Sequence, residues 1–264
     1  MATSTAIHQA LAFYIRSSTF PVGVLPLPKL GDGPPDLVKK AKAPKRDMGQ
    51  TITVCMGVGM ARRYGWTLLV RREDNVCPLG GIAMGFEPAK EKFWDGSLFA
   101  EYTGRPKEAV ARYAAETKRF DFGAYEGILV APLHAGEFEP ALTIVYGDSA
   151  QVMRLVQAAL FYRGGHLHSQ ASGGLDCSDL IVQTLQADDC QFILPCNGDR
   201  VFGMAQDHEM AFTMPRSKAD EVLRGLEATH QAGQRYPVPT FMRFEPKMPP
   251  AYQKLMDYLH RDDG

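Results

Sequence analysis

The sequence has almost no net charge, no long apolar run and no N-terminal segment of the secretory type. Its formal net charge is -1 over 264 residues, which gives no electrostatic reason to expect nucleic acid or an anionic membrane as a partner. No apolar run approaches the ~20 residues that span a bilayer, and residues 1–18 lack the basic and apolar regions of a secretory signal. We therefore expect a cytoplasmic protein, in a compartment where disulfides rarely persist.

The common signature motifs of enzymes are also missing. No P-loop, H-E-x-x-H or G-x-S-x-G motif is present. No C-x-x-C pair occurs either, so spacing alone predicts neither a zinc ribbon nor a ferredoxin-type run of cysteines. A nucleophilic cysteine stays open as an alternative, although no Cys/His partnership is recognisable in the sequence.

The composition is that of a folded globular protein. The chain is 45% hydrophobic and 22% charged, which is enough for a sizeable core in one large domain over residues 1–264. We expect an α+β fold with a mixed or antiparallel sheet, built from two pseudo-symmetric halves at about residues 20–135 and 136–231. A weak internal repeat supports the halves, because Gly65 and Cys77 recur as Gly165 and Cys177 at an offset of 100 residues.

Local patterns predict most of the helices and strands. Helices are expected near the N-terminus, at 51–65, after Cys77, at 105–120, 148–165 and 177–186, over 217–231 and near 252–260. Strands are expected at 20–28, 66–72, 126–133, 140–147 and 190–195, and a further strand at 166–172. The strands at 126–133 and 140–147 are separated by a short segment and are expected to pair with each other. Residues 29–47 are predicted as a loop.

Four of the five cysteines share a local context. Cys55 and Cys177 lie near the start of a predicted helix, Cys77 directly precedes one, and Cys196 follows a strand and precedes the polar turn N-G-D-R. Helix N-termini favour the thiolate that a metal or a nucleophilic reaction needs. The alternative is that each is an ordinary core residue. Cys190 lies inside an apolar strand and is interpreted as core.

Seven segments give the sequence a family resemblance. They are FPVGV, ITVCMGVGMARRYGWTLLVRREDNVCPLGGIAMGF, YEGILVAPL, GDSAQVMRLVQAALFYRGG, LDCSDLIVQTL, LPCNGDRVFG and HEMAFTMP. Together they resemble the uncharacterised prokaryotic family catalogued as domain of unknown function 169, over about residues 20–230. The resemblance implies that Cys55, Cys77, Cys177 and Cys196 form the family's cysteine set. It implies no reaction.

Four thiolates in a reduced compartment suit an iron–sulfur cluster or a structural zinc ion. We expect a cluster, [4Fe–4S] in type, because clusters often gather ligands from distant loops, and we keep zinc as the alternative. With three ligands, one iron would be open to act as a Lewis acid. The corresponding function is an iron–sulfur enzyme, an oxidoreductase or a lyase, acting on a small anionic molecule. The alternative is a zinc or thiolate scaffold without catalysis.

Charged residues near the cysteines complete the predicted site. Arg71 and Arg72 precede Cys77, while Asp199 and Arg200 follow Cys196. Guanidinium groups bind carboxylates, and Asp199 is a candidate acid or base. Ion pairs with neighbouring acids are the alternative for the arginines. His166 and His168 are interpreted as surface or packing residues rather than ligands. A redox partner protein and a homo-oligomer are further expectations.

Overall fold

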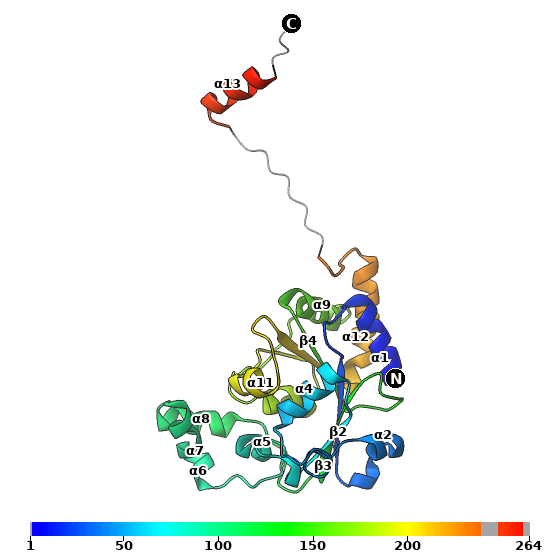
Figure 1. The fold of residues 1–264 in the computed structure, drawn as a ribbon, viewed down its shortest axis with the longest axis vertical. Helices are drawn as coiled ribbons and strands as arrows, with labels where there is room; N and C mark the ends of the chain where they lie inside the picture. Colours follow the sequence, from blue (N-terminus) through cyan, green and yellow to red (C-terminus); the bar gives the residue numbers. More distant parts are fainter. Residues whose placement is uncertain (1, 239–247, 261–264) are drawn as a thin grey trace.

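One six-stranded sheet forms the centre of the protein (Figure 1). The structure is a computed structural model that describes residues 2–238 and 248–260. The strands run in the order β2-β3-β1-β4-β6-β5, and every neighbouring pair is antiparallel. The predicted α+β class with an antiparallel sheet is therefore confirmed. The strands are β1 (Val22–Leu27), β2 (Leu68–Arg71), β3 (Gly127–Pro132), β4 (Leu142–Gly147), β5 (Gln191–Ile193) and β6 (Met210–Pro215).

Side chains on the two faces of the sheet enter two separate cores. In β3, Ile128 and Val130 join one core, while Leu129 and Ala131 join the other. This alternation follows from the two-residue period of a strand. Because both faces are covered, all six residues of β3 are buried. A run of apolar residues such as ILVAP is the sequence pattern of a strand buried on both faces.

Helices cover both faces of the sheet. One core contains residues of α1 (Ser4–Tyr14), α9 (Ser149–Leu160) and α12 (Arg216–Gln231), which pack beside one another (Figure 1). The opposite core contains residues of α4 (Val54–Tyr64), α5 (Pro78–Ala83) and the π-helical segment η3 (Cys177–Val182). All four predicted ligands come from helices associated with this second face. The other helical segments are η1 (Leu30–Asp32), α2 (Pro35–Lys40), α3 (Pro44–Met48), η2 (Arg72–Asp74), α6 (Glu91–Trp94), α7 (Ser97–Thr103), α8 (Lys107–Glu116), α10 (Gln183–Ala187), α11 (Asn197–Phe202) and α13 (Pro250–Leu259).

The sheet has an approximate two-fold arrangement. Strands β1, β2 and β3 come from residues 22–132, and β4, β5 and β6 come from residues 142–215. In each half the first strand is central, the third is next to it and the second lies at the edge. The two central strands pair antiparallel, as a two-fold axis between them requires. By this topology β2 corresponds to β5, and β3 corresponds to β6.

Three local predictions are wrong. Strands β3 and β4 do not pair with each other, because β1 lies between them and pairs with both. Residues 166–172 contain no strand, and His166 and His168 are exposed. The predicted loop at 29–47 contains the short helices α2 and α3. Within the described ranges, no helix is both long enough and apolar enough to cross a membrane.

Candidate functional site

The four predicted cysteines lie at the starts of four different helical segments. Cys55 is in the first turn of α4, Cys77 is the N-cap of α5, and Cys177 is the first residue of η3. Cys196 is the N-cap of α11. The N-G-D-R stretch is therefore the first turn of a helix, not the polar turn that the sequence suggests. A cysteine replaces the usual Ser, Thr, Asp or Asn at two caps, which is the reason that the α11 start is hard to predict.

The four thiols lie near one another, since Cys77, Cys55 and Cys196 all act electrostatically on Cys177. A methyl group built on Gly80 would lie 3.5 Å from Cys77 Sγ and 3.6 Å from Cys177 Sγ. Cys55 Sγ lies 3.8 Å from the Gly198 carbonyl oxygen, and a methyl group on Gly198 would lie 3.6 Å from Cys196 Sγ. The structure therefore brings together four cysteines that are up to 141 positions apart between Cys55 and Cys196.

The approximate two-fold arrangement relates the cysteines in pairs. Cys55 and Cys177 each begin the helix that precedes an edge strand, β2 or β5, and Cys77 and Cys196 each cap the helix that follows it. Topology thus pairs Cys55 with Cys177 and Cys77 with Cys196. The offset of 100 residues, which pairs Cys77 with Cys177, joins elements that are not equivalent. Each half contributes two thiols to one site.

Hydrogen bonds reach three of the sulfur atoms. The Gly80 N–H donates to Cys77 Sγ over 3.3 Å, and the Asp199 N–H donates to Cys196 Sγ over 3.4 Å. Cys55 Sγ is 2.9 Å from the Thr53 hydroxyl. Donors aimed at sulfur stabilise the thiolate relative to the thiol. Hydrogen bonds to the sulfur ligands are also among the interactions that set the reduction potential of a thiolate-bound cluster.

Burial opposes ionisation of these thiols. The pKa of Cys55 is raised to about 12. Burial is the main cause, the Thr53 hydrogen bond opposes it, and the negative charges of Asp199, Cys196 and Cys77 add to it. Burial, and then Asp176, raises the pKa of Cys196 to about 12. Burial also raises the pKa of Cys177 well above its ordinary value, with the other three thiols adding to the effect. Four thiolates side by side therefore need a cation, which a metal centre supplies.

The donor set matches thiolate-bound metal chemistry. Four thiols from separate helical starts lie close enough for their charges to act on one another, and Gly80 and Gly198, which adjoin the sulfur atoms, carry no side chains. Among the described residues, however, no three His, Cys, Asp or Glu side chains are already placed to hold a metal ion. A single ion needs every sulfur about 2.3 Å from one point. A cluster is held by thiolates bound to different irons, so its ligands surround a volume.

Two buried carboxyl groups adjoin Cys196. Tyr146 donates its hydroxyl to Asp199 Oδ2 over 2.7 Å, and the Cys196 N–H donates to Asp176 Oδ2 over 2.7 Å. Burial, and then the charge of Asp199, raises the pKa of Asp176 to about 8. Burial also raises the pKa of Asp199, against hydrogen bonds from Tyr146 and Asp176. Each of the two carboxyls has one buried oxygen, Oδ1, without a hydrogen-bond partner among the described residues.

Asp199 is thus the predicted acid or base that lies beside the thiols. Asp176 and Tyr146 are site residues that the sequence analysis missed. Asp176 has a sequence signal, because it directly precedes Cys177. Tyr146 has none, since it lies in an apolar strand like any core aromatic residue.

The three predicted arginines have other partners. Arg71 forms ion pairs with Glu73 at 2.7 Å and Asp74 at 2.9 Å. Arg72 pairs with Glu87 at 3.1 Å, and Arg200 Nη1 donates to the Gln206 carbonyl oxygen over 2.6 Å. Within the part of the chain that is described, no hydrogen bond or ion pair joins these arginines to a cysteine of the site or to the Asp199 side chain.

Cys190 lies apart from the other four cysteines. It is 1% exposed and belongs to the core on the opposite face of the sheet. Its interpretation as a core residue is confirmed.

Comparisons with known proteins agree with the resemblance. A family model for domain of unknown function 169, described as "Uncharacterised ArCR", matches residues 10–225. The chain belongs to this family. It is also 25% identical to the uncharacterized protein MJ0308 of Methanocaldococcus jannaschii over 180 residues, which cover 67% of this chain and 77% of that protein. No solved structure matches the chain. All four cysteines of the site fall inside the family match.

Proposed function

We propose that this protein is a cytoplasmic iron–sulfur enzyme whose cluster is bound by Cys55, Cys77, Cys177 and Cys196. The observation that carries the proposal is the convergence of four thiols, one from the start of each of four helical segments, close enough for their charges to act on one another. A cluster of the [4Fe–4S] type takes thiolate ligands of this number.

The cluster is preferred to zinc because the ligands arrive singly from separate elements rather than as the closely spaced pairs of structural zinc sites. Structural zinc in a scaffold protein is the alternative, and it predicts a different metal in the same four thiolates.

The residues of the chain would control charge and protons at the site. The backbone N–H groups of Gly80 and Asp199 stabilise negative charge on Cys77 and Cys196. The Asp176 and Asp199 pair holds a proton next to Cys196, where it is placed to exchange with a bound molecule. When bound, the cluster would supply electron transfer or, at an iron without a cysteine ligand, Lewis-acid chemistry. The corresponding reaction classes are oxidoreductase and lyase, on a small molecule.

The test is the metal and sulfide content of the full chain purified without oxygen. We expect a brown protein with broad violet absorption, about four irons and about four sulfides per chain. Zinc without sulfide, or no metal after anaerobic reconstitution with iron and sulfide, would overturn the cluster. Zinc in stoichiometric amount would instead support the scaffold function.

Single Cys→Ser variants then identify the ligands. We expect loss of iron and of violet absorption in variants of Cys55, Cys77, Cys177 and Cys196. The matched control is Cys190→Ser, which replaces a buried thiol on the other face of the sheet and should keep its iron. If one of the four variants retains a full cluster, that cysteine is not a ligand and the site has an open iron.

A further inference from the structure

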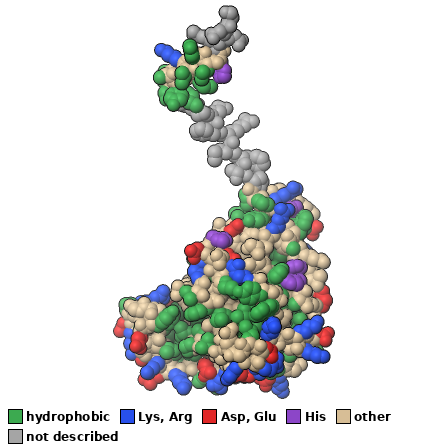
Figure 2. All heavy atoms as spheres, viewed as in Figure 1, with side chains coloured by type: hydrophobic (Ala, Val, Ile, Leu, Met, Phe, Trp, Pro, Cys, Tyr) green, Lys and Arg blue, Asp and Glu red, His purple; other side chains and the backbone are tan. Residues whose placement is uncertain are grey.

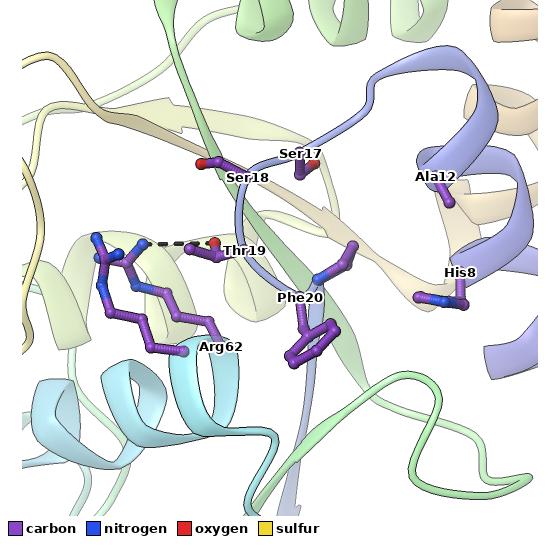
Figure 3. Close-up of a pocket in the computed structure, with 9 residues that line it drawn as sticks. His8, Ala12, Ser17, Ser18, Thr19, Phe20 and Arg62 are labelled. Atoms are coloured by element: carbon purple, nitrogen blue, oxygen red, sulfur yellow. Dashed lines mark hydrogen bonds between the residues drawn. The ribbon is translucent and has the colours of Figure 1, made fainter.

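A second cavity lies on the molecule away from the four thiols. It has a volume of about 380 Å³ and is formed by helix α1, the loop 16–21 and the C-terminal part of α4 (Figure 3). This volume is at the lower end of the range for small-molecule sites. Figure 3 shows His8 and Ala12 on one side, Arg62 on the other, and Ser17, Ser18 and Thr19 on the loop between them. The cavity is lined by His8, Ala12, Ser17, Ser18, Thr19, Phe20, Pro21, Arg62 and Arg63.

The walls of the cavity are fixed in place by hydrogen bonds. The Gln151 side chain donates to the carbonyl oxygens of Ile15 and Arg16, at 2.9 and 3.1 Å. The Phe20 N–H donates to the Arg62 carbonyl oxygen over 2.9 Å, which holds the loop against α4. Arg16 adopts a left-handed backbone with φ of 55°, and this turn separates the loop from α1. A cavity held in this way exists before a ligand arrives, which reduces the cost of binding.

The cavity has one positive charge in excess. Arg62 and Arg63 both line it, and the acidic residue that pairs with both is Glu209, at 2.9 and 3.1 Å. The nine lining residues include no acidic side chain. One arginine is therefore balanced by Glu209, and the other charge is available to a monoanion.

Several donors at the cavity have no partner in the described part of the chain. Arg62 is 1% exposed, yet its Nε is buried without a hydrogen-bond acceptor. The buried Ser17 hydroxyl also lacks a partner there. Arg63 Nη1 makes no hydrogen bond to the described residues, although its Nε and Nη2 donate to the Met204 carbonyl oxygen. The Arg62 Nε and Ser17 Oγ atoms are enclosed by protein, so Arg63 Nη1, on a side chain that is 25% exposed, is the donor that a ligand in the cavity can reach.

The remaining surface of the cavity is apolar and aromatic. The Phe20 ring contacts the His134 ring at a tilt of 59°, with ring centroids 4.3 Å apart, and the His134 and His8 ring centroids are 5.3 Å apart. Burial, and then the neighbouring His8, lowers the pKa of His134, so its ring remains neutral near pH 7. Ala12 and Pro21 contribute further apolar surface.

We propose that this cavity binds a small monocarboxylate with an apolar or aromatic body. The Arg63 guanidinium matches the charge and planar geometry of a carboxylate, and the Phe20 ring, which lines the cavity, accepts the body. A dianion such as phosphate would carry one more negative charge than the excess positive charge can balance. The site does not depend on the metal centre, so it can be tested on protein with or without a cluster.

Binding of benzoate, phenylacetate and 3-phenylpropionate to the full-length protein is the test, measured by calorimetry before and after cluster reconstitution. The matching alcohols serve as neutral probes, and inorganic phosphate serves as the dianion. We expect at least one carboxylate to bind about tenfold or more tightly than its alcohol and than phosphate, because charge-assisted hydrogen bonds contribute ~1.5–3 kcal/mol. Absence of binding, or equal binding of acid and alcohol, would overturn the proposal.

Two variants locate the binding. Arg63→Gln should weaken carboxylate binding about tenfold, and the partly exposed side chain makes this substitution compatible with folding. Ala12→Leu, at an exposed position on the wall, should fill the cavity and weaken binding while leaving every arginine in place. The control is Arg72→Gln, which removes an exposed arginine elsewhere and should change nothing. Unchanged binding in both cavity variants would place the ligand at another site.

Discussion

Cys55 and Cys190 show that two thiols with similarly raised pKa values can have very different surroundings. Burial raises the pKa of both thiols to about 12. Cys55 has Cys77 and Cys196 near it, whereas the charged groups acting on Cys190 include Asp189 and Arg163 but no thiol. The two thiols are therefore distinguished by what lies beside them, and the proposed ligand role of Cys55 rests on its neighbouring thiols. The sequence predicts this distinction only through the helix starts and the family resemblance.

The ion pair between Arg62 and Glu209 is a second feature set by individual residues. Both side chains are almost fully buried, and two hydrogen bonds of 2.9 and 3.0 Å join them. Arg62 also lies over the Tyr146 ring at 4.0 Å, and Tyr146 donates to Asp199. The pair therefore connects the cavity wall to the carboxyl group beside Cys196.

Glu209→Gln should destabilise the protein by about 3 kcal/mol at pH 7, because it leaves a buried arginine without its counter-charge. Burial pushes the pKa of Glu209 up, but the Arg62 hydrogen bonds and charge outweigh it and hold the pKa below the ordinary value. A carboxyl with a lowered folded pKa stabilises the fold above its unfolded pKa of about 4.3 and loses that contribution as the pH falls through the folded value. The difference between wild type and variant should therefore narrow below pH 4.

Urea unfolding across pH 3–7 measures this difference. Glu73→Gln is the control, because Glu73 is an exposed partner of Arg71 and such pairs contribute about 0–1 kcal/mol. A Glu209→Gln difference that stays constant down to pH 3 would show that the carboxylate charge does not stabilise the fold.

At the scale of elements, the contact between α4 and α11 sets the position of two cysteines. A methyl group on Gly59 would lie 2.4 Å from the Gly203 carbonyl oxygen, so no side chain fits between the helix and the end of α11. Helix α4 carries Cys55, and Cys196 caps α11. Close approach at one glycine thus fixes the distance between two thiols from different halves.

Gly59→Ala should therefore separate the two helices. We expect a loss of about 1–3 kcal/mol in unfolding free energy, as for other overpacked cores, and a lower iron content after reconstitution. Gly57→Ala is the matched control in the same helix, since its added methyl would lie 3.2 Å from a methyl group of Val70, which has to move by only a few tenths of an ångström. Alanine is favoured over glycine in a helix by ~1 kcal/mol, so Gly57→Ala should be nearly neutral. Equal behaviour of the two variants would contradict the role of this contact.

The same elements show what the sequence can and cannot predict. Helix α4 is predictable, because Gly65 ends it at a φ of 72° and apolar residues follow a helical period. Helix α11 is not, because its cap is a cysteine and its sequence N-G-D-R is typical of a turn. The π-helical turn at Cys177 has no sequence signal. Pairing of β3 with β4 was the natural prediction for neighbouring strands, but the insertion of β1 depends on contacts distant in sequence.

At the scale of the whole molecule, the site lies between two related halves. Each half supplies one cysteine before its edge strand and one after it, so neither half contains the full ligand set. The weak repeat in the sequence indicates the halves, but an offset of 100 residues misaligns them because insertions differ between them. Four α-helices, α5 to α8, lie between β2 and β3. In the described segment between β5 and β6, α11 is the one α-helix. Only the order of strands in the sheet gives the correct correspondence.

The C-terminal helix α13 lies outside this two-fold unit. The family match ends at residue 225, within α12, and every residue of α13 is exposed. By contrast, Val222 and Leu226 of α12 are 1% and 0% exposed in the core with α1 and α9. Burial therefore assigns α12 to the folded unit and leaves α13 out of it.

A chain ending at residue 238 should accordingly fold and bind metal like the full chain. We expect its melting temperature to lie within about 2 °C of the full-length value and its iron content to be unchanged, since the described residues that it lacks, 248–260, are all exposed and loss of exposed residues has little effect on unfolding free energy. A chain ending at residue 215 is the contrasting variant: it loses α12 and exposes the core that Val222 and Leu226 cover, so it should not fold. Thermal unfolding and iron analysis of the three chains measure both expectations. A clear loss of stability or iron in the 238-residue chain would mean that α13 contributes to the folded unit after all.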